Sequence, residues 1–190
     1  MLLHFRIQLA AITKPPVWRK LVVPGDLTFL DFHYILQAAF GWMNSHLFQF
    51  SEKGFGDRLV YTTLYPGVEV PEEEEQEEAG TVKLAKVFKK KGQKFTYIYD
   101  FGDSWTHKIT LEEITKDAPG KPALTAGKGA CPPEDCGGPW GYEGMKETLQ
   151  DPAHPEYQEL REWLGLKDGQ EWDPAAFDLP EAQERIDGLF

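Results

Sequence analysis

Two segments of the chain hold most of the residues that could do chemistry. One reads FTYIYDFGDSWTHKITL from Phe95 to Leu111, and the other reads CPPEDCGGPWGY from Cys131 to Tyr142. They combine a histidine, both cysteines of the chain, several carboxylates and a set of aromatic rings. The common signatures of hydrolases and nucleotide-binding proteins, a phosphate-binding glycine loop, HExxH and GxSxG, are absent from the sequence. The two segments therefore predict a site but not a reaction.

The first segment contains a pattern that is compatible with a divalent metal. Asp100, Asp103 and His107 follow a D-x-x-D-x-x-x-H spacing across a turn and into a strand, and His46 would join them if its own strand lies alongside. Carboxylate and imidazole ligands together suit divalent ions. The structural alternative is that the turn aspartates bond their own backbone and that His107 is a core residue with one buried partner.

The second segment contains the only two cysteines, Cys131 and Cys136. Their spacing is compatible with half of a zinc site, which needs two further ligands. A disulfide and two ordinary thiols are the alternatives. A cysteine nucleophile with a histidine base is disfavoured, because Glu134 and Asp135 would raise the pKa of a nearby thiol.

The segments also predict a binding surface. Aromatic rings at strand spacing usually belong to the core, but Trp140 lies in a loop rich in proline and glycine, where we expect its ring to be exposed. We predict that the recognition surface joins the acidic turn to this loop and consists of Asp100, Asp103, Trp105, His107, Cys131, Glu134, Asp135, Trp140 and Tyr142.

Length and composition favour a single globular domain over residues 1–190. The chain has 190 residues, of which 41% are hydrophobic, and it contains 18 glycines and 14 prolines. A chain of this size buries enough surface for one core without disulfides or metals. Because His4 and Arg6 interrupt the apolar N-terminus, neither a signal peptide nor a membrane span is predicted, and the expected location is the cytoplasm.

The net charge of −11 lies entirely in the last third of the chain. Residues 131–190 contain 15 Asp and Glu against 4 Lys and Arg, whereas residues 1–130 contain 16 of each. Nucleic-acid binding depends on cationic side chains that neutralise phosphates. The charge therefore favours a protein or peptide partner that is neutral or basic, and it disfavours DNA or RNA.

Periodicity predicts an α+β fold that begins with two strands and a helix. Strands are expected over Leu3 to Ile12 and Val17 to Val23. Thr28 is an expected helix N-cap, and the helix should end at Gly41. The residues HLFQF, from His46 to Phe50, alternate like a strand. The apolar residues of the helix recur at helical spacing: Phe32, Ile35, Leu36, Ala39 and Phe40.

The rest of the chain predicts a hairpin and short helices. Residues 69–80 are rich in glutamate and are expected to form a solvated loop. A short helix capped by Thr81 should follow it. Residues 94–100 and 104–114 form the strongest hairpin pattern, and residues 127–141 are expected to be an irregular loop rich in proline and glycine. The expected C-terminal helices cover residues 142–149, 155–164 and 180–189.

The chain resembles the plasmid pRiA4b ORF-3-like family, some of whose members are labelled passenger proteins of insertion elements. The resemblance covers nearly the whole chain and rests on PPVWRKLVVP, GWMNSHLFQF, YDFGDSWTHKITLE, ACPPEDCGGPWGYE and FDL, in that order. It implies an α+β domain, in which we expect an antiparallel sheet packed against one main N-terminal helix, with short C-terminal helices. It implies no defined activity.

Three functions follow as hypotheses. The leading one is a non-catalytic cytoplasmic binding or accessory module that needs no cofactor and that the resemblance would associate with a mobile element. The first alternative is a metal-dependent hydrolase that uses His46, Asp100, Asp103 and His107. The second is an accessory role in DNA recombination, implied by the resolvase-type label of some family members, although the arginines of this chain are isolated.

Overall fold

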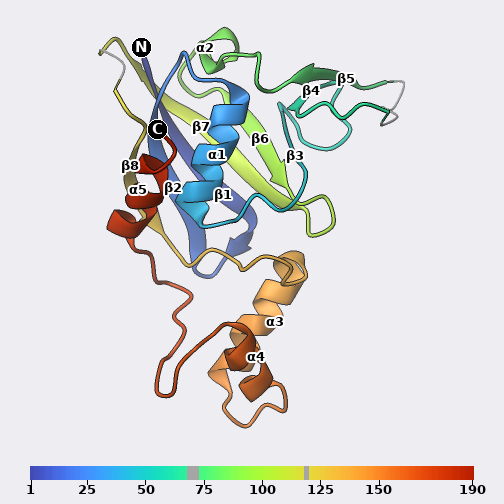
Figure 1. Cartoon of the computed structure of the whole chain (residues 1–190), viewed down its shortest axis with the longest axis vertical. Helices are drawn as coiled ribbons and strands as arrows, with labels where there is room; N and C mark the ends of the chain where they lie inside the picture. Colours follow the sequence, from blue (N-terminus) through green and yellow to red (C-terminus); the bar gives the residue numbers. More distant parts are fainter. Residues whose placement is uncertain (68–72, 118–119) are drawn as a thin grey trace.

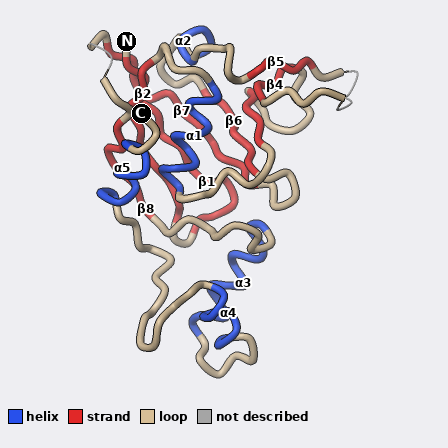
Figure 2. Tube along the Cα trace, viewed as in Figure 1, coloured by secondary structure: helices blue, strands red, loops and turns tan. Residues whose placement is uncertain are grey.

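The computed structural model describes residues 1–67, 73–117 and 120–190. Its elements form one α+β domain around an eight-stranded sheet whose strand order is β5-β4-β3-β6-β7-β1-β2-β8. Figures 1 and 2 show helices in front of the sheet and a helical arm that extends from one end of it. The strands are β1 (Leu2–Thr13), β2 (Pro16–Pro24), β3 (Phe48–Ser51), β4 (Leu59–Thr62), β5 (Glu75–Glu78), β6 (Lys94–Tyr99), β7 (Trp105–Thr115) and β8 (Ala123–Lys128). The helices are α1 (Phe29–Phe40), α2 (Leu84–Val87), α3 (Gly138–Gln150), α4 (Tyr157–Trp163) and α5 (Leu179–Asp187).

The alternating strands build the core beneath α1. In β1, every second residue from Leu3 to Leu9 is buried, so one face of the strand lies against the helices. Helix α1 begins with a capping box between Thr28 and Asp31 and ends at Gly41, whose left-handed φ of 97° suits glycine. The expected N-terminal strands, helix and hairpin are therefore present, with β6 and β7 paired antiparallel.

The sheet is mixed rather than purely antiparallel. Seven of its strands pair antiparallel, but β5 runs parallel to β4, with Leu59 opposite Glu75. The prediction of a solvated loop over residues 69–80 is thus wrong for Glu75–Glu78. Residues 69–72 lie outside the described part of the chain. Glutamates are tolerated in β5 because it is an edge strand whose side chains remain partly exposed.

The prediction of one main helix against the sheet is incomplete, because α5 packs beside α1 and against β8 (Figure 1). The side chain of Arg185 in α5 donates from Nε to the carbonyl oxygen of Ala38 in α1 at 2.9 Å. The apolar side chains that anchor α5 are Ala182 and Ile186, both fully buried. The C-terminal third therefore contributes to the main core as well as to the arm.

Several element boundaries differ from those expected, and two of them concern the residues around α2 and α3. Helix α2 has Lys83 at its N-cap, because Val82 is buried and Lys83 forms a bridge to Thr28. The irregular loop is shorter than residues 127–141, since β8 continues to Lys128 and α3 begins at Gly138. No helix among the described residues is both long enough and apolar enough to cross a membrane.

Candidate functional site

Three loops meet at one end of the sheet and bring one histidine and three carboxylates together. The loop after α1 supplies His46, the turn after β6 supplies Asp100, and the loop before α3 supplies Glu134 and Asp135. From Nε2 of His46, the nearest carboxylate oxygens are Oδ1 of Asp135 at 3.1 Å, Oδ2 of Asp100 at 3.7 Å and Oε2 of Glu134 at 3.8 Å. We call these four residues the His46 centre.

The backbone that carries His46 is fixed by hydrogen bonds to neighbouring elements. His46 lies in the loop that precedes β3, so the predicted strand over residues 46–50 begins two residues too early. The Asn44 backbone N–H donates to Oε1 of Gln37 at 2.8 Å, and the Ser45 N–H donates to the hydroxyl of Tyr99 at 2.9 Å. The indole of Trp42 donates to the carbonyl of Pro132 at 2.9 Å, which joins this loop to the loop of Glu134.

A buried polar network holds the start of the same loop. Gln37 donates from Nε2 to the hydroxyl of Tyr97, which is 2.8 Å from Nδ1 of His33, while Nε2 of His33 is 2.6 Å from Oδ1 of Asn44. Burial lowers the pKa of His33 to about 4, so its ring is neutral at pH 7. The consistent tautomer accepts from Tyr97 at Nδ1 and donates from Nε2 to Asn44. His33 is thus a structural residue that supports the loop.

One carboxylate oxygen of Asp100 accepts hydrogen bonds within its own turn, and the other points toward His46. Its Oδ1 accepts from the backbone N–H of Gly102 at 2.9 Å and of Asp103 at 3.3 Å. Asp100 has a left-handed φ of 55°, which aspartate tolerates, and it is only 7% exposed. Its Oδ2 is the oxygen 3.7 Å from His46. The turn therefore aims a nearly buried carboxylate at the centre.

Glu134 follows the same arrangement. Its Oε1 accepts from the Met43 backbone N–H at 2.8 Å and from the Tyr99 hydroxyl at 2.9 Å. Its Oε2 is buried without a hydrogen-bond partner, as is Nε2 of His46. Burial, together with the neighbouring Glu134, raises the pKa of Tyr99, so this hydroxyl remains a donor at any physiological pH. One side of the glutamate is held in place and the other is free to bind.

Asp135 completes the centre from the solvent side. Its side chain is 71% exposed, and it also has a left-handed φ of 55°. The ligand atoms of His46, Asp100 and Asp135 all lie within 4.8 Å of one another, and Glu134 adds a fourth oxygen. Two ligand atoms that share an ion at about 2.1 Å would be about 3.0–3.4 Å apart. The observed spacing requires only small adjustments to reach that value.

Three predicted surface residues are instead in the core. Trp105, His107 and Tyr142 are each at most 1% exposed, so the prediction that they line a recognition surface is wrong. His107 faces inward because β7 alternates, and its Nδ1 contacts the carbonyl oxygen of Trp105 at 2.9 Å. Burial lowers its pKa to about 3. His107 is therefore a neutral core residue and does not join His46, which also corrects the predicted metal set.

Asp103 lies beside the His46 centre without being grouped with it. Its backbone N–H donates to Asp100, its Oδ2 is buried without a partner, and its carbonyl lies against Gly138 at the start of α3. Glycine is needed at 138 because an added Cβ would lie 2.7 Å from that carbonyl oxygen. Asp103 thus helps to attach α3 to the turn.

The two cysteines are free thiols. Burial raises the pKa of Cys136 to about 12 and that of Cys131 further still. Both thiols are therefore protonated at neutral pH, which makes them poor nucleophiles. The metal-compatible group found among the described residues contains neither of them.

Trp140 is 90% exposed in the first turn of α3, as its position in the loop predicted. Sequence patterns missed the residues that position the centre, above all Tyr99, which joins Ser45 to Glu134. The alternation of β6 assigned Tyr99 to an apolar core, and nothing in that pattern indicates that its hydroxyl reaches two loops.

The sequence is similar to that of other proteins over most of its length. The sequence matches the family described as "Plasmid pRiA4b ORF-3-like protein" over residues 1–181. It is 40% identical over 182 residues to the uncharacterized protein y4hQ of Sinorhizobium fredii strain NGR234, covering 93% of this chain and 86% of that one.

A solved structure is similar over nearly the whole chain. The crystal structure of a protein of unknown function from Methanosarcina mazei Go1, MM3350, is 35% identical, with a TM-score of 0.77, and the match covers 95% of this chain and 96% of that one. The match to the family over residues 1–181 and the 40% identity to a relative lead to one conclusion: the chain belongs to the plasmid pRiA4b ORF-3-like family.

Proposed function

We propose that this protein is a non-catalytic cytoplasmic accessory module that binds one divalent transition-metal ion at the His46 centre. The single observation that carries the proposal is the convergence of Nε2 of His46 on three carboxylate oxygens at 3.1–3.8 Å. Two of these four atoms are buried without a hydrogen-bond partner, which is costly unless something binds them.

The chemistry of the ligands favours zinc or manganese. One imidazole with several carboxylates suits both ions, whereas Mg²⁺ and Ca²⁺ prefer oxygen ligands alone. Asp100 and Glu134 are each held through their other oxygen by backbone or tyrosine donors. Such outer hydrogen bonds orient the ligands of metal sites. The sequence led us to expect a protein without a cofactor. This proposal instead adopts the alternative, a bound divalent metal.

Metal titration tests the proposal. The protein, stripped with a chelator and desalted, is titrated with Zn²⁺ and Mn²⁺ by calorimetry, and the metal retained after a second desalting is counted by elemental analysis. We expect one ion per chain. Glu134→Gln keeps Oε1 as an acceptor but loses the Oε2 ligand, so affinity should fall at least about 100-fold.

The matched control is Asp26→Asn, which removes an exposed carboxylate outside the centre. It should bind metal like the unchanged protein. Equal affinities for Glu134→Gln and Asp26→Asn, or no uptake of either ion, would refute the proposal.

Metal-dependent hydrolysis is the second candidate function. It is favoured by a cavity of about 480 Å³ that His46 helps to line, together with Ser45, Leu47 and Tyr65. A divalent ion lowers the pKa of a bound water toward neutrality. Turnover of an activated ester or phosphodiester by the zinc-loaded or manganese-loaded protein, lost in Glu134→Gln, would replace the accessory role with this one.

A role in DNA recombination has less support. The Arg19 guanidinium is buried and donates to the carbonyl oxygens of Trp18, Ala39, Lys128 and Gly129, so it is not available for a phosphate. Arg161 likewise donates to Lys167 and Gln170. Salt-sensitive retardation of a DNA duplex would be required to restore this hypothesis.

A further inference from the structure

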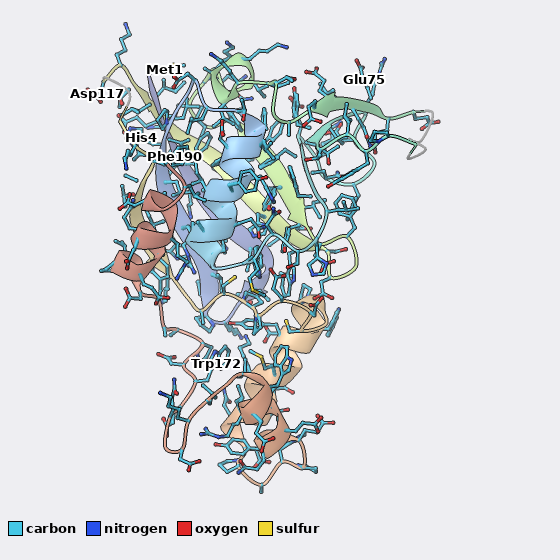
Figure 3. The ribbon with its side chains drawn as sticks, viewed as in Figure 1. Met1, His4, Glu75, Asp117, Trp172 and Phe190 are labelled. Atoms are coloured by element: carbon cyan, nitrogen blue, oxygen red, sulfur yellow. The ribbon has the colours of Figure 1, made fainter. Side chains whose placement is uncertain are left out.

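Helices α3 and α4 form an arm that extends beyond the sheet (Figures 1 and 3). Helix α3 is tied to the body by two side chains: the Tyr142 hydroxyl donates to the carbonyl oxygen of Ala130, and Nζ of Lys146 donates to that of Lys14. Trp172, labelled in Figure 3, packs edge-on against Tyr142 at 5.8 Å where the chain returns from the arm. Helix α4 has no buried residue. The arm is therefore attached to the body through α3, and α4 packs mainly against α3.

A groove of about 770 Å³ lies between the two helices. On its α3 side Gly141 and Gly144 contribute no side chains, and Met145 adds an apolar surface. Leu160 and Trp163 line the α4 side, and Trp163 is 52% exposed. A Cβ added at Gly144 would meet no atom within 4 Å, whereas one at Gly141 would collide with the Cys136 carbonyl. The groove is thus open and apolar along its centre.

Every charged residue that lines this groove is acidic. The side chains are Glu147, Asp151, Glu156 and Glu159, with His154 and Cys136 as the other titratable groups, and neither lysine nor arginine is among the lining residues. An apolar surface with acidic edges is complementary to a segment that carries apolar side chains on one face and cationic side chains beside them.

The arrangement of the arm indicates what kind of segment fits. Two helices expose an apolar seam that most folds cover with a third element. Leu160 and Trp163 lie three residues apart on α4 and both line the groove, and the exposed Trp140 lies one turn before Gly144 on α3. A helix placed in the groove would contact Met145 on one side and Leu160 and Trp163 on the other, as in helix-in-groove recognition.

We propose that the α3–α4 groove binds a basic amphipathic helix of a partner protein. The groove uses none of the four residues of the His46 centre, so this proposal does not depend on the metal. It does agree with the acidic last third of the chain, which supplies all four of the lining carboxylates.

Fluorescence anisotropy with a labelled peptide tests the proposal on the full chain. The probe is a 14-residue helical peptide of leucine and lysine at amphipathic spacing, and the control peptide replaces each lysine by glutamate. The lysine peptide should bind and the glutamate peptide should not. The double variant Glu147→Lys with Glu159→Lys should weaken binding at least about tenfold, because it reverses charge on both sides of the groove.

Two further variants separate the groove from general acidity and from misfolding. Asp168→Lys with Glu171→Lys makes the same change in net charge at exposed positions that do not line the groove, and it should leave affinity within about twofold. Gly144→Phe fills the open floor without changing charge, so it should block the peptide even if the charge-reversed variant loses helix.

Equal effects of the two charge-reversed pairs, or full binding by Gly144→Phe, would overturn the proposal. Self-association of the unchanged protein that Gly144→Phe abolishes would also overturn it, because the occupant would then be a second copy of the chain. Glu134→Gln should bind the peptide normally whatever it does to metal, so the two proposals can fail independently.

Discussion

Two regions of the molecule place a histidine among aromatic rings, and they differ in what faces the imidazole. His107 in β7 packs edge-on against Phe40 and Trp42, with ring centroids 4.8 and 5.1 Å away. His46 lies 5.8 Å from the ring of Tyr99 but directs Nε2 toward three carboxylates. In both histidines Nε2 is buried without a hydrogen-bond partner.

The comparison shows that an unpaired nitrogen alone does not mark a functional site. At His107 the ring is neutral, its Nδ1 is hydrogen-bonded to backbone carbonyl oxygens, and its Nε2 lies without a partner among apolar groups. At His46 the unpaired Nε2 faces only carboxylate oxygens. Such an arrangement is stable when a cation, either a proton or a metal ion, lies between the nitrogen and these oxygens. The surroundings of the imidazole therefore distinguish a core histidine from a candidate ligand.

The largest expected effects come from replacing each of the two histidines in turn. His107→Ala should reduce the free energy of unfolding by about 3 kcal/mol, because it leaves a cavity among packed rings. His46→Gln should change stability little but weaken zinc binding about 100-fold, because it removes the one nitrogen ligand. Urea unfolding of the metal-free proteins and calorimetric zinc titration measure the two effects separately.

His4→Gln is the matched control, since His4 contacts Thr115 and lies near the N-terminus, as Figure 3 shows. It should leave the free energy of unfolding and the zinc affinity nearly unchanged. A loss of zinc affinity in a folded His107 variant as large as that in His46→Gln would mean that the two regions are not distinct.

The sequence predicts the fold well wherever local periodicity decides the structure. The structural alternative in which His107 is a core residue is confirmed by the alternation of β7, and the expected N-cap Thr28 begins α1 with a capping box to Asp31. Periodicity was less informative for Glu75–Glu78, because the parallel pairing of β5 with β4 depends on an edge that only the folded sheet offers.

The candidate site was predicted only in part, because three loops from distant parts of the chain form it. Asp100, Glu134, Asp135 and His46 were all named as candidates, but in two different groups. The spacing from Asp100 to His107 suggested a shared metal, whereas the strand turns His107 into the core. Which loop lies beside which is decided by long-range contacts, such as that from Trp42 to Pro132, that no local pattern contains.

The next effect, of intermediate size, is a dependence of stability on pH that comes from the buried histidines. Burial lowers the pKa of His33 to about 4 and that of His107 to about 3, below the usual value near 6.5. The unfolded chain therefore binds more protons below pH 6.5, and stability is lost as pH falls from 6.5 toward 4. Each histidine should contribute about 2 kcal/mol of loss between pH 7 and pH 5.

Urea unfolding of the metal-free protein at pH 7 and pH 5 measures this loss of stability. The variant His33→Gln tests how much of the loss comes from His33. The variant lacks one of the two titrating groups, so its difference between the two pH values should be about 2 kcal/mol smaller, whatever its stability at pH 7. An unchanged difference would show that His33 is not held neutral by the network of Tyr97 and Asn44.

The smallest predicted effect tests how the His46 centre is supported. Tyr99→Phe removes the hydroxyl that accepts from the Ser45 N–H and donates to Oε1 of Glu134, so it loosens two loops of the centre at once. We expect zinc affinity to fall about tenfold and stability to fall by about 1 kcal/mol, as for other outer-shell hydrogen bonds. Tyr157→Phe, in the arm, is the control and should change neither. If Tyr99→Phe lowers stability but leaves zinc affinity unchanged, the ion does not depend on the oxygen of Glu134 that this hydroxyl orients, and the centre would reduce to His46, Asp100 and Asp135.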